Sequence, residues 1–249
     1  MTRSRLAHAL PQMPTMTEAP IRMPQFTQNW FDGNIPSLQR WLGEFSGRPG
    51  LRALEIGSFE GRSTLWLCEN ILTAEDARID CLDLFATDPV HGDYLSRFRH
   101  NTSEHTWKVR EVHGPSFEGL RQVEGPYDIV YVDGWHSAFG ALADGVMSWP
   151  MLKVGGVMVF DDYLWVPPKY GEPPVPGALA RFWATLRGRN AAHEAMEKHI
   201  AACATECPKR GVDGLLATLE GHYEVVGVDR QIAVRKTREF GHAQVGLDT

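Results

Sequence analysis

Short apolar segments alternate with stretches of helical spacing through the middle of the chain, and this alternation constrains the fold more than any other feature. Five such segments have the length and composition of strands: residues 52–57, 79–84, 107–112, 127–132 and 157–160. Strands separated by helices predict β-α-β units with right-handed crossovers, and therefore a doubly wound, mostly parallel sheet. Residues 223–236 predict two more strands around a tight turn at Asp229 and Arg230. The sequence thus predicts an α/β fold with a seven-stranded sheet that ends in a C-terminal antiparallel hairpin.

The length of 249 residues fits a single domain with extensions. We expect a flexible N-terminal arm at residues 1–25, one domain at 26–240 and a tail at 241–249. Helical spacing returns at residues 177–186 and 191–207. The region at about 187–212 is predicted to be a helical insertion. It could serve as a lid or as a contact between copies in a homo-oligomer, and the sequence leaves both open.

Composition excludes several classes of protein. The net charge is −6, which argues against a nucleic-acid binder with a basic stripe. No run of about 18 uninterrupted apolar residues is present, so we expect no transmembrane helix and no membrane partner. Four cysteines are too few and too irregularly spaced for a disulfide scaffold. These features predict a soluble, cytoplasmic protein.

The residues after the first predicted strand form a candidate ligand-binding loop. Ligands of open α/β sheets bind outside the carboxyl ends of the strands. Here the chain reads Glu55-Ile56-Gly57-Ser58-Phe59-Glu60-Gly61-Arg62-Ser63. Glycines let a ligand approach the backbone, and the start of the next helix offers N–H groups to a carboxylate. The spacing Gly-x-x-x-Gly differs from the dinucleotide fingerprint, which argues against a nicotinamide cofactor. A tight turn without a ligand fits the same residues.

Two further strand ends carry polar side chains. Asp83 ends the second strand, 26 positions after Gly57, where a carboxylate can accept hydrogen bonds from ribose hydroxyls. A helix N-cap or a solvated loop acid is the alternative for Asp83. Ser116 follows the third strand and is placed either to contact an adenine edge or to cap the next helix.

The fourth and fifth strands end in carboxylates. Asp133 begins the sequence Asp-Gly-Trp-His, and Asp161 and Asp162 precede a tyrosine. Neighbouring parallel strands would bring these three acids together, and like charges held together are unfavourable without a cation. Hard oxygen ligands are those that Mg²⁺ prefers. We therefore expect a divalent metal site made of Asp133, Asp161 and Asp162, with loop capping and no metal as the alternative.

In this order, the segments ALEIGSFEGRS, CLDLF, YDIVYVDGWH and GGVMVFDDY resemble the class I S-adenosylmethionine-dependent methyltransferases. More narrowly, they are similar to the metal-dependent O-methyltransferases of the catechol type and of the macrocin and mycinamicin sugar type. The resemblance covers residues 50–165 and continues more weakly to the final hairpin. It implies a Rossmann-like methyltransferase fold that binds S-adenosylmethionine and a divalent cation such as Mg²⁺.

The resemblance also implies roles for individual residues. The methionine end of the cofactor would be shaped by Glu55, Gly57, Ser58, Gly61 and Ser63. Asp83 would hold the ribose, and Ser116 would lie near the adenine. Asp133 would border the cofactor and bind the metal together with Asp161 and Asp162.

His136 falls three positions after Asp133, where the catechol enzymes carry a lysine base and the macrolide-sugar type a histidine. This departure disfavours a catechol substrate. An imidazole with its ordinary pKa near 6.5 can accept a hydroxyl proton at neutral pH. We therefore expect His136 and Asp133 to be catalytic, while a purely structural hydrogen bond is the alternative for His136.

These features together predict metal-dependent O-methylation of a hydroxyl on a small molecule, such as a sugar or a secondary metabolite. Within the same fold, a metal-independent N-methyltransferase is an alternative. The same constellation also resembles cephalosporin-pathway proteins related to hydroxylation, so an auxiliary, non-methylating role stays open. No residue in the sequence identifies the acceptor.

Overall fold

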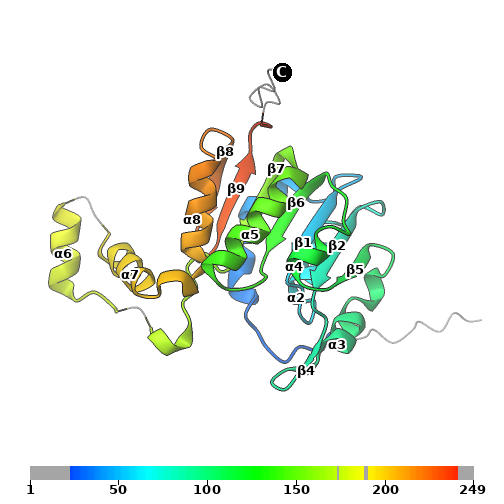
Figure 1. Ribbon diagram of the computed structural model, residues 1–249, viewed down its shortest axis with the longest axis horizontal. Coiled ribbons are helices and arrows are strands. Elements are labelled where there is room, and N and C mark those ends of the chain that lie inside the picture. The colour runs from blue at the N-terminus through cyan, green and yellow to red at the C-terminus, as the bar shows by residue number, and fades with distance from the viewer. Residues whose placement is uncertain (1–22, 173, 188–189, 241–249) are drawn as a thin grey trace, which may run out of the picture.

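The strands of the main sheet follow the order β5-β2-β1-β6-β7-β9-β8 (Figure 1). The computed structural model describes residues 23–172, 174–187 and 190–240. The seven strands are β1 (Arg52–Ile56), β2 (Arg78–Asp83), β5 (Val109–His113), β6 (Tyr127–Val132), β7 (Leu152–Phe160), β8 (Tyr223–Val228) and β9 (Ile232–Lys236). Neighbours from β5 to β7 pair in parallel, whereas β9 pairs antiparallel with β7 and β8. The predicted seven-stranded sheet with a C-terminal antiparallel hairpin is confirmed.

Some boundaries differ from those expected. β7 begins at Leu152 rather than at residue 157, and β5 spans Val109–His113 rather than 107–112. A second, two-stranded sheet consists of β3 (Thr87–Asp88) and β4 (Gly92–Asp93). Each of these strands has only two residues, which is too short to give a period-2 pattern.

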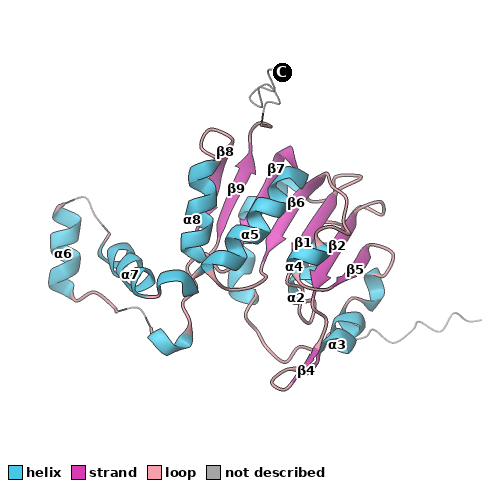
Figure 2. Cartoon of the chain, viewed as in Figure 1, coloured by secondary structure: helices cyan, strands magenta, loops and turns pink. Residues whose placement is uncertain are grey.

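Helices flank the sheet on both sides (Figure 2). They are α1 (Ile35–Leu42), α2 (Arg62–Asn70), α3 (Tyr94–Asn101), α4 (Ser116–Gly119), α5 (Ala138–Ser148), α6 (Ala178–Leu186), α7 (Ala191–Ala202) and α8 (Pro208–Thr218). Short 3-10 turns lie at Asp32–Asn34, Gly43–Phe45, Ser103–His105, Trp149–Met151, Pro168–Tyr170 and Ala204–Glu206. Side chains cap two of the helices. The Asp93 carboxylate accepts from the Ser96 N–H at 3.0 Å, and the Ser137 hydroxyl accepts from the Gly140 N–H at 2.9 Å.

Two apolar clusters fill the space between the sheet and its helices. Successive residues of β6 alternate between them: Ile129 and Tyr131 face the cluster that contains residues of α1, α2 and α3, whereas Val130 and Val132 face the cluster with α5 and α8. Burial on both faces explains why β6 reads as a nearly continuous apolar run. The sheet therefore forms the middle of three layers, and its strand ends are held rigidly.

α6 and α7 project from this body as an arm (Figure 1). A small cluster of Ile200, Cys203 and Cys207, packed against Leu164 and Tyr170, joins the base of the arm to the body. α7 ends at Ala202, short of the predicted residue 207. The proposed insertion at 187–212 also takes in the first residues of α8, which packs against α5 over the sheet.

Most of the predicted arm at 1–25 and the predicted tail at 241–249 lie outside the described residues. Among the residues that the structure describes, no helix has the length and apolar character needed to cross a bilayer.

Candidate active site

The loops that follow β1, β2, β5, β6 and β7 meet at one edge of the sheet, because these strands run parallel. β1 lies between β2 and β6, so the chain order reverses there. Crevices at such reversals are where ligands bind in open α/β folds. Every residue that the sequence singled out lies in or beside these loops.

Gly57 is the point at which two of these loops touch. Its φ is +88°, and a Cβ placed on it would lie 1.9 Å from the carbonyl oxygen of Asp133. The Asp133 N–H donates to the carbonyl of Ile56 at 2.8 Å, and the Gly57 N–H donates to the carbonyl of Leu82 at 2.7 Å. Only glycine fits this combination of backbone angle and close approach. The loop after β1 and the loop after β6 are therefore fixed to one another.

The rest of the glycine loop is supported from beneath. Gly61, with φ +78°, precedes α2, and a Cβ there would lie 2.9 Å from the Phe98 ring. Ser58 and Ser63 are buried, as is Glu55, which accepts a hydrogen bond from the Thr64 hydroxyl. Burial raises the pKa of Glu55, an effect that the neighbouring hydroxyls oppose. Glu55 is thus placed to support the loop from inside the protein.

Asp83 joins two turns of unusual backbone conformation. Its carboxylate accepts from the Phe59 N–H at 2.9 Å and from the Phe85 N–H at 3.0 Å. Both phenylalanines have a φ of +46°, which is uncommon for residues other than glycine. The Tyr94 hydroxyl donates to the same carboxylate at 3.1 Å. Each carboxylate oxygen can accept more than one hydrogen bond, so the ribose-binding role of Asp83 stays a prediction.

Ser116 is the first residue of α4, and Pro115 occupies the N-cap position. No side chain caps this helix, so the capping alternative for Ser116 is not what the structure shows. The nearby carboxyl group belongs to Asp144 of α5, which is buried and has no hydrogen-bond partner within normal distance. Burial raises the pKa of Asp144 to about 6, and the Ser116 hydroxyl partly offsets the rise. The adenine contact of Ser116 stays a prediction.

Asp133, His136 and Asp162 form the centre of the site. One donor atom from each lies within 4.8 Å of the other two. Nε2 of His136 is 2.8 Å from Oδ2 of Asp162 and 3.2 Å from Oδ1 of Asp133. The three side chains line a small hollow, partly open to solvent, together with Trp135 and others. The carboxylate oxygens of Asp133 and Asp162 at these separations fit a divalent cation, and the imidazole of His136 lies beside them.

Asp161 lies beside this cluster but has a different environment. Its Oδ1 accepts from Asn34 Nδ2 at 3.0 Å and from the Tyr131 hydroxyl and the Gln231 amide. The sequence predicts Asp161 as a metal ligand but does not predict these three partners. Tyr131 could have been found, because alternation along β6 places residues 131 and 133 on one face. Asn34 and Gln231 gave no comparable signal.

The acids and the imidazole alter one another's proton affinity. Burial and the Asp161 charge raise the pKa of Asp133 well above its usual value, and burial and the Asp162 charge raise the pKa of Asp161 to about 7. Burial alone would lower the pKa of His136, but the bonds to Asp133 and Asp162 outweigh it and raise the pKa to about 10. His136 is therefore protonated at neutral pH in this arrangement. A histidine with the ordinary pKa near 6.5, as expected from the sequence, would be mostly neutral there.

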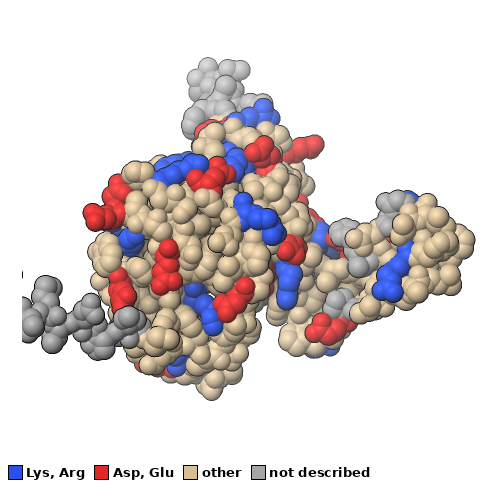
Figure 3. Space-filling view, turned by 180° about the vertical axis from the view of Figure 1, so that it is seen from behind, with Lys and Arg blue, Asp and Glu red and all other residues tan. Residues whose placement is uncertain are grey.

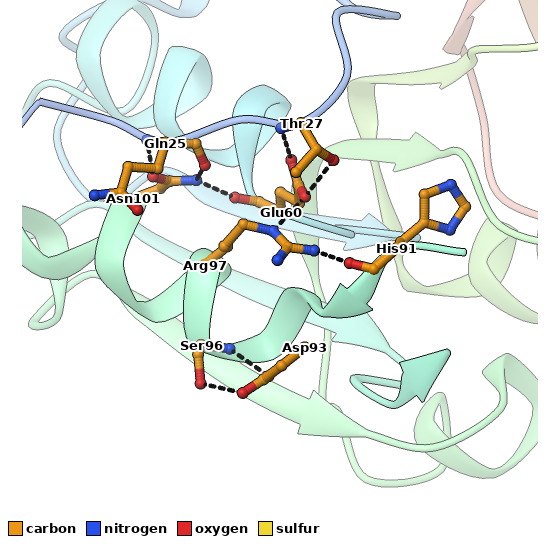
Figure 4. A network of polar contacts seen from close by, with 8 residues as sticks. All are labelled: Gln25, Thr27, Glu60, His91, Asp93, Ser96, Arg97 and Asn101. Carbon is orange, nitrogen blue, oxygen red and sulfur yellow. Dashed lines mark hydrogen bonds and ion pairs between the residues drawn. The ribbon is translucent and has the colours of Figure 1, made fainter. Parts of the chain in front are cut away.

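The segment from Gln25 to Asn34 crosses from the glycine loop to the acid cluster. Gln25 and Asn101 exchange two hydrogen bonds, from the Gln25 N–H at 2.7 Å and from the Asn101 amide at 2.9 Å (Figure 4). At the other end, Asn34 donates to Asp161. None of the predicted cofactor, catalytic or metal residues lies in this segment.

Glu60 anchors the middle of the segment. Its buried carboxylate accepts from the Thr27 N–H at 2.7 Å, from the Thr27 hydroxyl at 2.8 Å and from Arg97 Nε at 2.5 Å (Figure 4). Arg97 also donates to the carbonyl of His91. Trp30 stacks on Phe59 of the glycine loop, with 5.6 Å between the ring centroids. The segment is thus held to the loop by a charged network and by aromatic contact.

Comparison with known proteins agrees with this geometry. Residues 54–163 match the family of methyltransferase domains. The O-methyltransferase hkm8 of Aspergillus hancockii is 30% identical over 129 residues, which are 51% of this chain and 49% of that protein. The chain thus spans about half the length of this curated relative.

Two solved structures share the fold. Cofactor-bound Rv0187 from MTB has a TM-score of 0.51 and 17% identity, covering 87% of this chain and 84% of its own. The MycE methyltransferase of the mycinamycin biosynthetic pathway, in complex with Mg, SAH and mycinamycin VI, also has a TM-score of 0.51 and 17% identity, covering 85% of this chain and 51% of its own. Residues 54–163 are thus similar to methyltransferase domains, and the fold is the one that the sequence resemblance implied.

Proposed function

We propose that this protein transfers a methyl group from S-adenosylmethionine to a hydroxyl of a small molecule, such as a sugar or a secondary metabolite, with the help of a divalent cation. The observation that carries the proposal is the meeting of Asp133, His136 and Asp162 beside the glycine loop. Gly57 touches the backbone of Asp133, so the cofactor loop and the acid cluster lie next to one another.

The glycine loop fits the proposed cofactor. A Cβ at Gly57 would collide with the Asp133 carbonyl and one at Gly61 with the Phe98 ring, so glycine at both positions keeps the loop in this conformation. The start of α2 offers N–H groups suited to a carboxylate. Glu55, Ser58 and Ser63 support the loop from inside, while Asp83 and Ser116 are the proposed ribose and adenine contacts. Bound S-adenosylmethionine supplies an electrophilic methyl group.

The acid cluster fits the proposed cation. Asp133 and Asp162 would hold it, with Asp161 beside them, positioned by its three hydrogen-bond donors. A bound divalent cation supplies positive charge that favours loss of a hydroxyl proton. The MycE structure contains Mg together with SAH and mycinamycin VI, and this precedent supports a divalent cation and a small-molecule acceptor.

His136 is the proposed general base. Its Nε2 faces both carboxylates, whose negative charge stabilises the imidazolium. A bound cation would offset that negative charge and so lower the pKa of His136. Nε2 could then take up the hydroxyl proton of the methyl acceptor at neutral pH.

The four cysteines are free and buried, in keeping with the proposed cytoplasmic setting.

Calorimetry and product analysis test the function. We expect S-adenosylmethionine to bind, and mass spectrometry to detect methylated product from a panel of sugars, phenols and amines when Mg²⁺ is present. EDTA should abolish turnover, and excess Mg²⁺ should restore it. Methylation of amines in EDTA would instead establish a metal-independent N-methyltransferase. Binding of the cofactor without turnover on any acceptor would favour the auxiliary role.

A further inference from the structure

The outer helix of the arm exposes large apolar side chains. Leu179, Phe182, Trp183 and Leu186 of α6 are 70%, 55%, 50% and 62% exposed. Ala184 is the one buried residue of this helix. Figure 1 shows α6 beyond α7, away from the sheet and its covering helices. A contiguous apolar surface of this kind marks an interaction site in a folded protein.

A second apolar surface lies on the body. Trp135, Phe139 and Val146 are 68%, 68% and 51% exposed and occupy one side of α5 and the loop before it. The rings of Trp135 and Phe139 meet edge to face, with 6.0 Å between centroids. Phe117 on the adjoining α4 is also exposed. We refer to these four residues as the α5 surface.

We propose that α6 of one copy packs on the α5 surface of a second copy, and that the reverse contact closes a two-fold dimer. Both surfaces belong to the same chain, so a two-fold axis buries the α6 side chains and the α5 surface of both copies at once. An aromatic side chain can bury about 150–250 Å², so one patch supplies only a few hundred Å². A stable interface buries about 1,200–2,000 Å² in total. Two contacts between α6 and the α5 surface can bury that much area, whereas a single contact cannot.

Charge supports this pairing. α6 contains Arg181, is followed by Arg187 and has no acidic residue. α4 and α5 contain no basic residue, and Glu118 of α4 is exposed. In Figure 3 the far end of the arm is mostly uncharged, with basic side chains and no acidic ones in view. Arg181 of α6 and Glu118 beside the α5 surface carry opposite charges, whereas a contact between two copies of α6 would bring like charges together.

The dimer also concerns the candidate active site. Trp135 lines the same pocket as His136 and Asp162. A partner helix seated on the α5 surface therefore borders the entrance to that pocket with Phe182 and Trp183. This consequence for the acceptor site rests on the proposed function, whereas the dimer itself does not.

Sedimentation of the full chain at micromolar concentration tests the proposal. We expect a dimer for the wild type and a monomer for both Phe182→Lys and Phe139→Glu, each with an unchanged circular dichroism spectrum. The decisive sample is an equimolar mixture of the two variants. It should return to the dimer mass, because a mixed dimer keeps one wild-type contact and pairs lysine with glutamate at the other. Val154→Glu, at an exposed valine of β7, is the matched control and should remain dimeric.

Three results would overturn the dimer: a monomeric wild type, a Phe139→Glu variant that stays dimeric, or a mixture that stays monomeric. The second would indicate contact between two α6 helices. Methyl transfer is measured separately. A wild-type dimer without turnover on any acceptor contradicts the proposed function alone, and an active monomer contradicts the dimer alone.

Discussion

Oδ2 of Asp162 lies 2.8 Å from Nε2 of His136, although the two residues follow different strands of the sheet. The same nitrogen is 3.2 Å from Asp133. The carboxylates of Asp133 and Asp162, which are suited to bind a cation, are thus the same groups that stabilise the protonated form of His136. Proton and cation compete for the same negative charge, so metal content and protonation state are linked at this site.

In metal-free protein, the pKa of His136 should lie well above 6.5, in the direction of about 10, because two carboxylates stabilise the imidazolium. Removing one of them in Asp162→Asn should lower it, and so should Mg²⁺. NMR titration of the ring signals measures this directly. His105, whose pKa burial lowers, is an internal reference that should not respond to Mg²⁺. Titration of His136 near or below 6.5 without metal would contradict the prediction.

The roles of Asp133 and His136 can be separated. Asp133→Asn should lower Mg²⁺ affinity and abolish turnover while leaving S-adenosylmethionine affinity nearly unchanged. His136→Ala should reduce kcat about 10²–10⁴-fold, the usual effect of losing a general base, with Mg²⁺ affinity retained. Kinetics and calorimetry give the two readouts, and Glu220→Gln on the surface is the control. If His136→Ala weakens Mg²⁺ as strongly as Asp133→Asn does, His136 is a metal ligand instead of the base.

Gly57→Ala should destabilise the protein by about 1–3 kcal/mol or more and weaken cofactor binding, because the new Cβ meets the Asp133 carbonyl and the backbone has a positive φ. Urea unfolding and calorimetry measure the two effects. Gly43→Ala is the matched control, since its φ is −57° and no atom lies within 4 Å of the added Cβ. Equal stability of the two variants would show that the loops can separate without penalty.

Glu60→Gln should loosen the segment around Thr27. The amide replaces a buried carboxylate that accepts from Thr27 and Arg97, and weakening hydrogen bonds to a charged group destabilises a protein by about 1–3 kcal/mol. Hydrogen exchange of residues 25–31 should become faster. Glu44→Gln, which alters an exposed ion pair, should leave that exchange unchanged. Unaltered exchange in Glu60→Gln would mean that the aromatic contact alone holds the segment.

Asp144→Asn should change the pH dependence of stability. Burial raises the pKa of Asp144 to about 6 in the folded protein, so its ionisation destabilises the fold as pH rises through that value. The variant lacks this penalty. Relative to wild type, its free energy of unfolding should increase between pH 4 and pH 8 by on the order of 3 kcal/mol. Urea unfolding at both pH values checks this, and a constant difference would contradict it.

The sheet was predictable because its central strands are buried on both faces, as the residues of β6 show. The helix α8 was missed for a physical reason. Gly211 reads as a helix breaker, yet a Cβ there would lie 1.8 Å from the Ala138 carbonyl, so glycine is what lets α8 approach α5.

The placement of the candidate site residues was predictable only where it depends on strand ends. Gly57, Asp83, Asp133 and Asp162 follow from the parallel topology. The partners of Asp161 do not, because Asn34 and Gln231 lie 127 and 70 residues away and are joined to it only by tertiary packing. The raised pKa of His136 could not be predicted for the same reason, because it depends on the distances between His136 and carboxylates in two different loops.

The hydrogen bonds to Asp161 also set an order of assembly during translation. Asn34 and Tyr131 are synthesised before Asp161, whereas Gln231 follows it by 70 residues. At about 5–20 residues per second, that gap lasts several seconds on the ribosome. Throughout this interval a nascent chain holds the aspartate pair without its third donor. The acid cluster therefore reaches its final form only after the C-terminal hairpin has been made.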